Sequence, residues 1–166
     1  MPMPTPFGKT AVYATLGPEG TNHDTVLRAW LSAADTAAKI ALHDDLTDAL
    51  AACAGGTADH VFLCAAHPAA SRLVSEAQYK HGILLSHCFI AESQPLALLC
   101  RSDTVTLDTV ALHPATRHYT DLAAFDSVFE VNSTVEAYRG MLDGRWPCAL
   151  TAARFSGEPG ARLISH

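Results

Sequence analysis

Short apolar runs alternate along this chain with longer stretches in which apolar residues recur every three or four positions. The short runs have the length of buried strands, and the longer stretches have the spacing of amphipathic helices. The pattern predicts strands at 12–16, 39–43, 60–65, 109–113, 127–131 and 148–151, helices at 22–34, 68–79, 115–123 and 133–142, and a further helix that Asp44 or Asp45 caps and that ends at Cys53. This alternation is typical of an α/β sandwich with mostly parallel sheets.

The alternation breaks in the middle of the chain, where two extended runs, 83–92 and 95–101, follow one another with no helix between them. Such a break favours two lobes connected by crossover strands. We expect lobe 1 to comprise about residues 11–92 and 152–166 and lobe 2 about residues 93–151, after a flexible leader at 1–10. Ligands of open α/β sheets bind outside the carboxyl ends of the strands, so we expect helix N-termini to converge on a cleft there.

A tight turn, Gly17-Pro18-Glu19-Gly20, connects the first predicted strand to the first predicted helix. Thr21 can then cap that helix, with Asp24 three residues later as in a capping box. The sequence from Ser133 to Glu136 has the same capping pattern. A helix that begins in this way directs free N–H groups and a partial positive charge at one point, which suits a carboxylate or phosphate. An ordinary strand–turn–helix without a ligand fits the same residues.

Composition and charge narrow the classes of function. The chain of 166 residues is 49% apolar and carries a net charge of −6 without a basic cluster, which argues for one globular domain that binds no nucleic acid. No apolar run is long enough to cross a bilayer, and the first residues do not resemble a signal peptide, so we expect no membrane partner and a cytoplasmic location. The five cysteines and nine histidines form no metal-binding motif. We therefore expect free thiols, no metal and no cofactor.

Three segments resemble the prephenate dehydratase family, in the family's order. Residues 15–21, Thr-Leu-Gly-Pro-Glu-Gly-Thr, resemble its N-terminal signature, His113-Pro114 resembles its Ser-His-Pro segment, and residues 132–137 resemble the start of its Ser-Thr-x-Glu-Ala helix. The likeness covers roughly residues 11–155 and is closest to the short prephenate decarboxylase branch of the bacilysin-pathway type. It implies a two-lobed, periplasmic-binding-protein-like (type 2) sandwich. The substrate that it implies is prephenate, a cyclohexadienol with two carboxylates.

The sequence departs from that family at positions that matter for its chemistry. The family's Thr-Arg-Phe motif, whose threonine is tied to loss of the ring hydroxyl, is absent, and the similar Ala153-Arg154-Phe155 has no hydroxyl at its first position. Residues 64–67, Cys-Ala-Ala-His, replace the family's Pro-Ile-Glu-Asn, and Ala115-Thr116 replaces the glutamine that follows His-Pro. We therefore expect a cofactor-free lyase that decarboxylates prephenate in preference to dehydrating it.

The candidate catalytic residues are three histidines near the carboxyl ends of predicted strands, since an imidazole can donate a proton near neutral pH: His23, His67 and His113. The candidate substrate-binding residues are Gly20, Thr21, Asn22, Thr116, Arg117, Ser133 and Thr134. His113 could instead be a strand-end histidine that is hydrogen-bonded to the backbone.

Two other functions fit the same residues. One is a lyase that acts on another aromatic acid, by dehydration or deamination, and the other is a non-catalytic protein that binds an aromatic acid or amino acid. A homodimer is a further expectation, with exposed apolar residues such as Trp146 at the contact.

Overall fold

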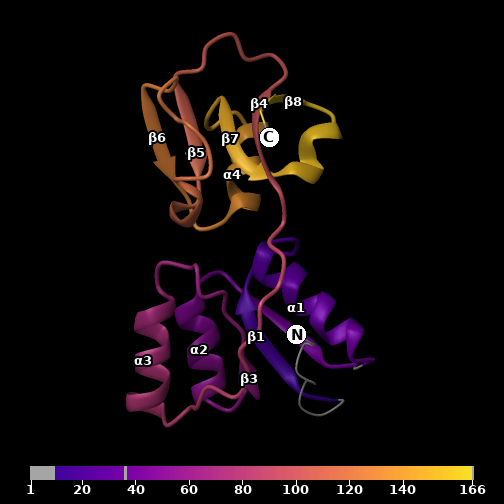
Figure 1. The fold of residues 1–166 in the computed structure, drawn as a ribbon, viewed down its shortest axis with the longest axis vertical. Coiled ribbons are helices and arrows are strands. Elements are labelled where there is room, and N and C mark those ends of the chain that lie inside the picture. The colour runs from indigo at the N-terminus through magenta and orange to yellow at the C-terminus, as the bar shows by residue number, and fades with distance from the viewer. Residues whose placement is uncertain (1–9, 36, 166) are drawn as a thin grey trace. The chain divides into compact units, whose positions relative to one another are not determined.

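The computed structural model describes residues 10–35 and 37–165, which form two compact units. Unit 1 ends at Ser93 and unit 2 begins at Gln94 (Figure 1). The expected leader at 1–10 lies outside the described residues except for Thr10, which is exposed. No helix in the described part of the chain is long and apolar enough to cross a membrane.

Unit 1 is built on a three-stranded parallel sheet with the order β2-β1-β3. The strands are β1 (Val12–Leu16), β2 (Lys39–His43) and β3 (His60–Val61), and the helices are α1 (Asn22–Ala33), α2 (Leu46–Ala54) and α3 (Ala70–His81). Helix α1 covers one face of the sheet, and α2 and α3 cover the other (Figure 1). This arrangement confirms the predicted strand–helix order of the first lobe.

The helix boundaries in unit 1 follow local signals in the sequence. Thr21 caps α1 with its hydroxyl, Asp45 caps α2 with its carboxylate, and Gly82 ends α3 with a positive φ of 68°. Only a residue that tolerates the left-handed region ends a helix in this way at low cost. The predicted strand at 60–65 is wrong in length, because the hydroxyl of Thr15 rather than a backbone N–H donates to the carbonyl of Phe62.

Unit 2 is built on a five-stranded mixed sheet with the order β6-β5-β7-β4-β8. Its strands are β4 (Leu96–Arg101), β5 (Thr109–Leu112), β6 (Ser127–Glu130), β7 (Cys148–Ala152) and β8 (Ala161–Ser165). Strands β6 and β7 pair with β5 in parallel, whereas β4 runs antiparallel to both β7 and β8. Helix α4 (Thr134–Leu142) packs on β7, β4 and β5.

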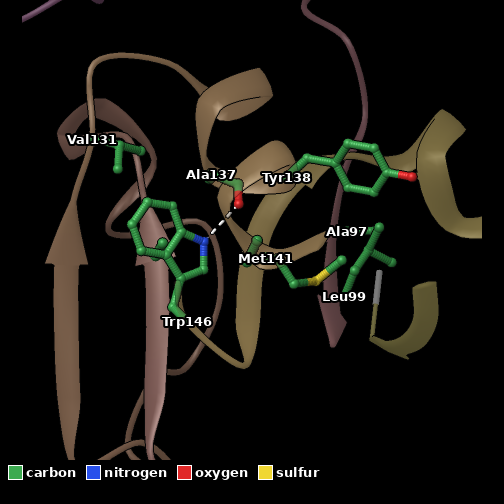
Figure 2. Close-up of a cluster of buried hydrophobic side chains, with 9 residues drawn as sticks. Ala97, Leu99, Val131, Ala137, Tyr138, Met141 and Trp146 are labelled. Carbon is green, nitrogen blue, oxygen red and sulfur yellow. Dashed lines mark hydrogen bonds between the residues drawn. The ribbon is translucent and has the colours of Figure 1, made fainter. Parts of the chain in front are cut away.

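Side chains of β4 alternate between two apolar clusters, as the period of a strand requires. Ala97 and Leu99 face the cluster under α4, and Leu98 and Cys100 face the opposite side of the sheet. Trp146 lies in the α4 cluster, where its indole N–H donates to the Ala137 carbonyl at 2.7 Å (Figure 2). With 5% of its surface exposed, Trp146 is a core residue. Its expected place at an exposed dimer contact is wrong.

The last strand corrects the expected division of the chain into lobes. Strand β8, which the sequence analysis did not predict, pairs with β4 from Leu98 to Arg101, with a shift of register between Leu98 and Leu99. Residues 152–166 were expected in the first lobe, but their described part belongs to unit 2. The run 83–92 was expected as a crossover strand, but it joins neither sheet of the described residues.

The predicted helix at 115–123 is also wrong. Only a short 3₁₀ helix, η1 (Pro114–Thr116), forms there. The hydroxyl of Thr116 donates to the His113 carbonyl at 2.7 Å, and the carboxylate of Asp121 accepts from the N–H of Ala123 at 2.9 Å. Such local bonds between side chains and backbone compete with the backbone ladder of a helix.

Free thiols were expected throughout, but Cys100 and Cys148 form a disulfide. The two residues lie directly opposite one another in the antiparallel pair of β4 and β7. Cys53, Cys64 and Cys88 are free. The pairing follows from the register of two strands that are 48 residues apart, which no local pattern encodes.

Substituting Gly140 by alanine is expected to destabilise unit 2 by about 1–3 kcal/mol, because the new Cβ would overlap the Trp146 ring. That Cβ would lie only 2.1 Å from Cζ2 of the indole. Gly157→Ala is the matched control, since nothing lies within 4 Å of its Cβ position. Urea unfolding followed by Trp fluorescence measures both variants. Equal stabilities would contradict this packing.

Alkylation of the denatured protein is expected to modify three thiols without reductant and five after reduction. Because the crosslink restricts the unfolded chain, replacing both Cys100 and Cys148 by alanine should lower the free energy of unfolding by about 4 kcal/mol. Mass spectrometry counts the modified thiols. Five modifications before reduction would show that the two strands carry free thiols in solution.

Candidate functional site

The carboxyl ends of β1 and β3 bring four residues of unit 1 together, because parallel strands end at the same edge of a sheet. Asn22 and His23 begin the helix that follows β1, and Cys64 and His67 lie in the turn that follows β3. We call these four residues the unit 1 cluster. It contains two of the three predicted catalytic histidines, together with one predicted substrate-binding residue.

Side chains of the protein itself form hydrogen bonds at the N-terminus of α1. The Thr21 hydroxyl donates to the Leu16 carbonyl at 3.0 Å and accepts from the N–H of Asp24 at 3.3 Å. The Gly20 N–H donates to the Asp24 carboxylate at 2.8 Å, and Arg28 donates to the same carboxylate at 2.7 Å. Thr21 is therefore a helix cap whose hydroxyl is already used, and the Asp24 carboxylate holds the Gly20 N–H.

Asn22 links the two strand ends of the unit 1 cluster. Its side-chain amide donates to the Cys64 sulfur at 3.6 Å, from the first turn of α1 to the turn after β3. Burial raises the pKa of the Cys64 thiol, and the Asn22 hydrogen bond opposes this effect. The thiol form is therefore favoured over the thiolate, which makes Cys64 a contact residue and a poor nucleophile.

The imidazole rings of His23 and His67 lie against each other. Their centroids are 5.7 Å apart and their planes meet edge to face at 76°. His23 is 6% exposed and also contacts the ring of Phe62. His23 and His67 lie on separate segments of the sequence, and the fold brings their rings into contact.

His67 is held by the backbone of its own turn. Its Nδ1 accepts a hydrogen bond from the N–H of Ala69 at 3.1 Å. Burial lowers the pKa of the His67 imidazole, although the Asp45 carboxylate nearby acts in the opposite direction. Since Nδ1 accepts, the proton of the neutral ring is on Nε2. The neutral ring of His67 thus carries its proton on Nε2, and the lowered pKa favours this neutral form at neutral pH.

Unit 2 contains the same turn at the end of β5. His113, Pro114 and Ala115 repeat the sequence His67-Pro68-Ala69, and Nδ1 of His113 accepts from the N–H of Ala115 at 3.2 Å. His113 is buried, with 9% of its surface exposed. The repeated His-Pro-Ala tripeptide is the signal in the sequence that the analysis of motifs missed.

The predicted binding residues of α4 act first as its cap. The Ser133 hydroxyl accepts from the N–H of Glu136 at 3.0 Å, and the Glu136 carboxylate accepts from the N–H of Asn132 at 3.0 Å. The predicted cap by Ser133 is confirmed, whereas the Glu136 carboxylate of the predicted capping box reaches Asn132 and not Ser133. The carbonyl of Thr134 accepts from the buried Thr151 hydroxyl at 2.7 Å, which fixes the first turn of α4 on β7.

Thr116 and Arg117, the remaining candidate binding residues, bond other groups of the protein. The Thr116 hydroxyl holds the His113 turn, and the Arg117 guanidinium pairs with the exposed Glu130 carboxylate at 3.2 Å. No group of three or more His, Cys, Asp or Glu side chains that could hold a metal ion occurs among the described residues.

Comparison with known proteins shows which fold the chain shares with solved structures. No protein-family model matches the sequence, and no curated protein does. The chain resembles solved structures over most of its length. A prephenate dehydratase from Arthrobacter aurescens, in complex with L-Phe, is 22% identical over 93% of this chain, with a TM-score of 0.59. The periplasmic VFT2 domain of BvgS from Bordetella pertussis is 16% identical over 95% of this chain and 75% of its own, with a TM-score of 0.57. A mutant of the arginine-bound ArgBP from T. maritima is 10% identical over 95% of this chain and 82% of its own, with a TM-score of 0.53.

The fold is that of the type 2 periplasmic-binding-protein-like domains. This confirms the fold class expected from the strand–helix order and from the family resemblance. The chain spans about half, 54%, of the length of the prephenate dehydratase that it resembles. A likeness at these identities shows the fold alone.

The imidazole of His67 is expected to titrate below the usual histidine pKa of about 6.5, since burial disfavours its charged form. The unfolded chain then binds a proton more tightly than the folded chain as the pH falls through about 6.5, so the folded state loses stability toward acid. NMR titration of the His67 ring measures the pKa directly. In urea unfolding, His67→Asn should lose less stability than the wild type between about pH 7 and pH 5. A His67 pKa above the usual value would contradict the expected sign.

Proposed function

We propose that this protein is a cofactor-free lyase that acts on a cyclic or aromatic carboxylate, with prephenate as the substrate and decarboxylation as the reaction. The observation that carries the proposal is the pair of His-Pro-Ala turns, in which the backbone engages Nδ1 of His67 and of His113. In each turn, the proton of the neutral ring is then on Nε2. The prephenate dehydratase structure with L-Phe and the resemblance of residues 15–21 and 132–137 support the substrate class.

The chemistry requires few groups from the protein. In decarboxylation, the bond between the ring and its carboxylate breaks, its electron pair moves into the diene, carbon dioxide leaves and a ring carbon takes up a proton. In its neutral form, His67 can donate a hydrogen bond to a substrate oxygen but is a weak acid. His23, whose ring lies against His67, is then our candidate for the proton donor in unit 1.

The absence of one hydroxyl favours decarboxylation over dehydration. The segment that is similar to the family's Thr-Arg-Phe begins with Ala153, which cannot donate a hydrogen bond from its side chain to a leaving hydroxyl. In this segment the Arg154 guanidinium lies 4.6 Å from the centre of the Phe155 ring. A lyase that acts on another aromatic acid is compatible with the same residues.

A non-catalytic protein that binds an aromatic acid or amino acid is the second candidate. Two observations favour it. The hydroxyls of Thr21 and Ser133 are engaged as helix caps, so they serve the fold and not a reaction. In addition, the arginine-bound ArgBP and the BvgS VFT2 domain have the same fold.

Incubation of the protein with prephenate should release carbon dioxide and leave a product without an aromatic spectrum. His67→Asn should lower kcat/KM at least about 100-fold, because the asparagine oxygen can still accept from the Ala69 N–H while the Nε2–H donor is lost. His67→Gln, which can carry a donor near the Nε2 position, should retain more activity than His67→Asn. His81→Asn on the surface of α3 is the matched control and should leave the rate unchanged. Mass spectrometry and ultraviolet spectra identify the product.

The outcomes separate the candidates. Formation of phenylpyruvate above the rate without enzyme would establish dehydration and contradict decarboxylation. A thermal shift with prephenate, L-Phe or L-Arg in the absence of turnover would support the binding protein and overturn the lyase. If prephenate is neither consumed nor bound, it is not the ligand of this protein.

A further inference from the structure

A cavity of about 760 Å³ lies in unit 1, where the segment 83–91 follows α3 and passes β3 (Figure 1). This segment and the residues of β3 both line the cavity. Asn22 and Cys64 of the unit 1 cluster line it too, so the cavity borders the candidate site. Sites that hold a small molecule have volumes of about 300–1,000 Å³. The cavity therefore has the size of a ligand site.

Aromatic rings form a large part of the cavity wall. The Phe89 ring, in the segment 83–91, lies 5.1 Å from the Trp30 ring and 6.2 Å from the Phe62 ring, measured between centroids. The Tyr13 ring meets the Trp30 ring edge to face at 5.8 Å. All four rings line the cavity. Aromatic rings attract one another at centroid distances of about 4.5–7 Å, so a planar ring that enters the cavity extends this set of contacts.

The charge of the cavity wall disfavours an ionised ligand. Among the described residues that line the cavity there is no lysine or arginine, and the one carboxylate is that of Asp59, which accepts from the N–H of Val12 at 2.8 Å. Burial lowers the pKa of the His60 imidazole and so favours its neutral form, although the Asp59 carboxylate opposes this effect. A carboxylate or phosphate in the cavity would lose its hydration without gaining a lysine or arginine partner, which costs free energy.

We propose that this cavity binds an uncharged aromatic molecule, with its ring against Trp30, Phe62 and Phe89. The segment 83–91 suits the wall of such a site, because it contains no Asp, Glu, Lys or Arg residue. Leu84 also lines the cavity and is 73% exposed, so an apolar occupant shields this side chain from water. The occupant differs in charge from prephenate, which has two carboxylates, and the proposal does not rest on the proposed reaction.

Three small molecules of similar size test the charge and the ring separately. NMR titration of the isotope-labelled protein follows the two indole N–H signals, since the chain contains two tryptophans. Phenylacetamide should shift the Trp30 signal to saturation and leave the Trp146 signal in place, because Trp146 lies in the core of unit 2. Phenylacetate, which is charged, should bind at least about tenfold more weakly. Cyclohexylacetamide, which has no aromatic ring, should bind at least about threefold more weakly.

Phe89→Leu keeps an apolar side chain but removes one ring from the wall, so it should weaken the binding of phenylacetamide at least about threefold. The substitution breaks no helix or strand, because the segment 83–91 forms neither. Phe129→Leu is the matched control and should leave the binding unchanged, since Phe129 stacks on the Trp146 ring in unit 2 and does not line the cavity. Circular dichroism checks that both variants are folded.

Several results would overturn the proposal. These are a Trp30 signal that does not move with phenylacetamide, equal affinities for phenylacetamide and phenylacetate, equal affinities for phenylacetamide and cyclohexylacetamide, and an unchanged affinity in Phe89→Leu. A failure to consume prephenate would contradict the proposed reaction and leave this binding site untouched, because the titration measures binding without turnover.

Discussion

Parallel pairing of β1 with its two neighbours is the constraint on which the candidate site of unit 1 depends. Because the three strands point in the same direction, their carboxyl ends meet at one edge, and the segments that follow them must turn there. The first turn of α1 and the turn after β3 thus lie side by side, joined by the bond from Asn22 to the Cys64 sulfur. The contact of the His23 and His67 rings is a consequence of strand direction more than of either local sequence.

In both units the backbone engages the groups that would otherwise bind a ligand most readily. Thr21 and Ser133 cap their helices, and the Asp24 carboxylate takes the Gly20 N–H. Each His-Pro-Ala turn engages one ring nitrogen and thereby determines which nitrogen carries the proton of the neutral ring. The hydroxyls of Thr21 and Ser133, which the sequence suggested as ligand contacts, hold the ends of their helices.

The two units protect their sheets in different ways. Unit 2 has five strands, with β4 enclosed between β7 and β8 and crosslinked to β7 by the disulfide. In the described part of the chain, unit 1 has three strands, and its sheet ends at the two-residue strand β3, beside a cavity that the segment 83–91 lines. An edge strand this short offers few backbone groups for pairing with another chain.

Local patterns in the sequence were sufficient for the elements whose signals lie within a few residues of one another. The strand 12–16, the caps at Thr21 and Ser133 and the end of α3 at Gly82 belong to this group, because caps and periodicity act within one or two turns. Only the tertiary structure decided the disulfide between Cys100 and Cys148, the burial of Trp146, the pairing of β8 with β4 and the contact of His23 with His67. Each of these depends on strand register or packing between segments far apart in the chain. A single sequence records the residues that meet there, but not which segment each of them will meet.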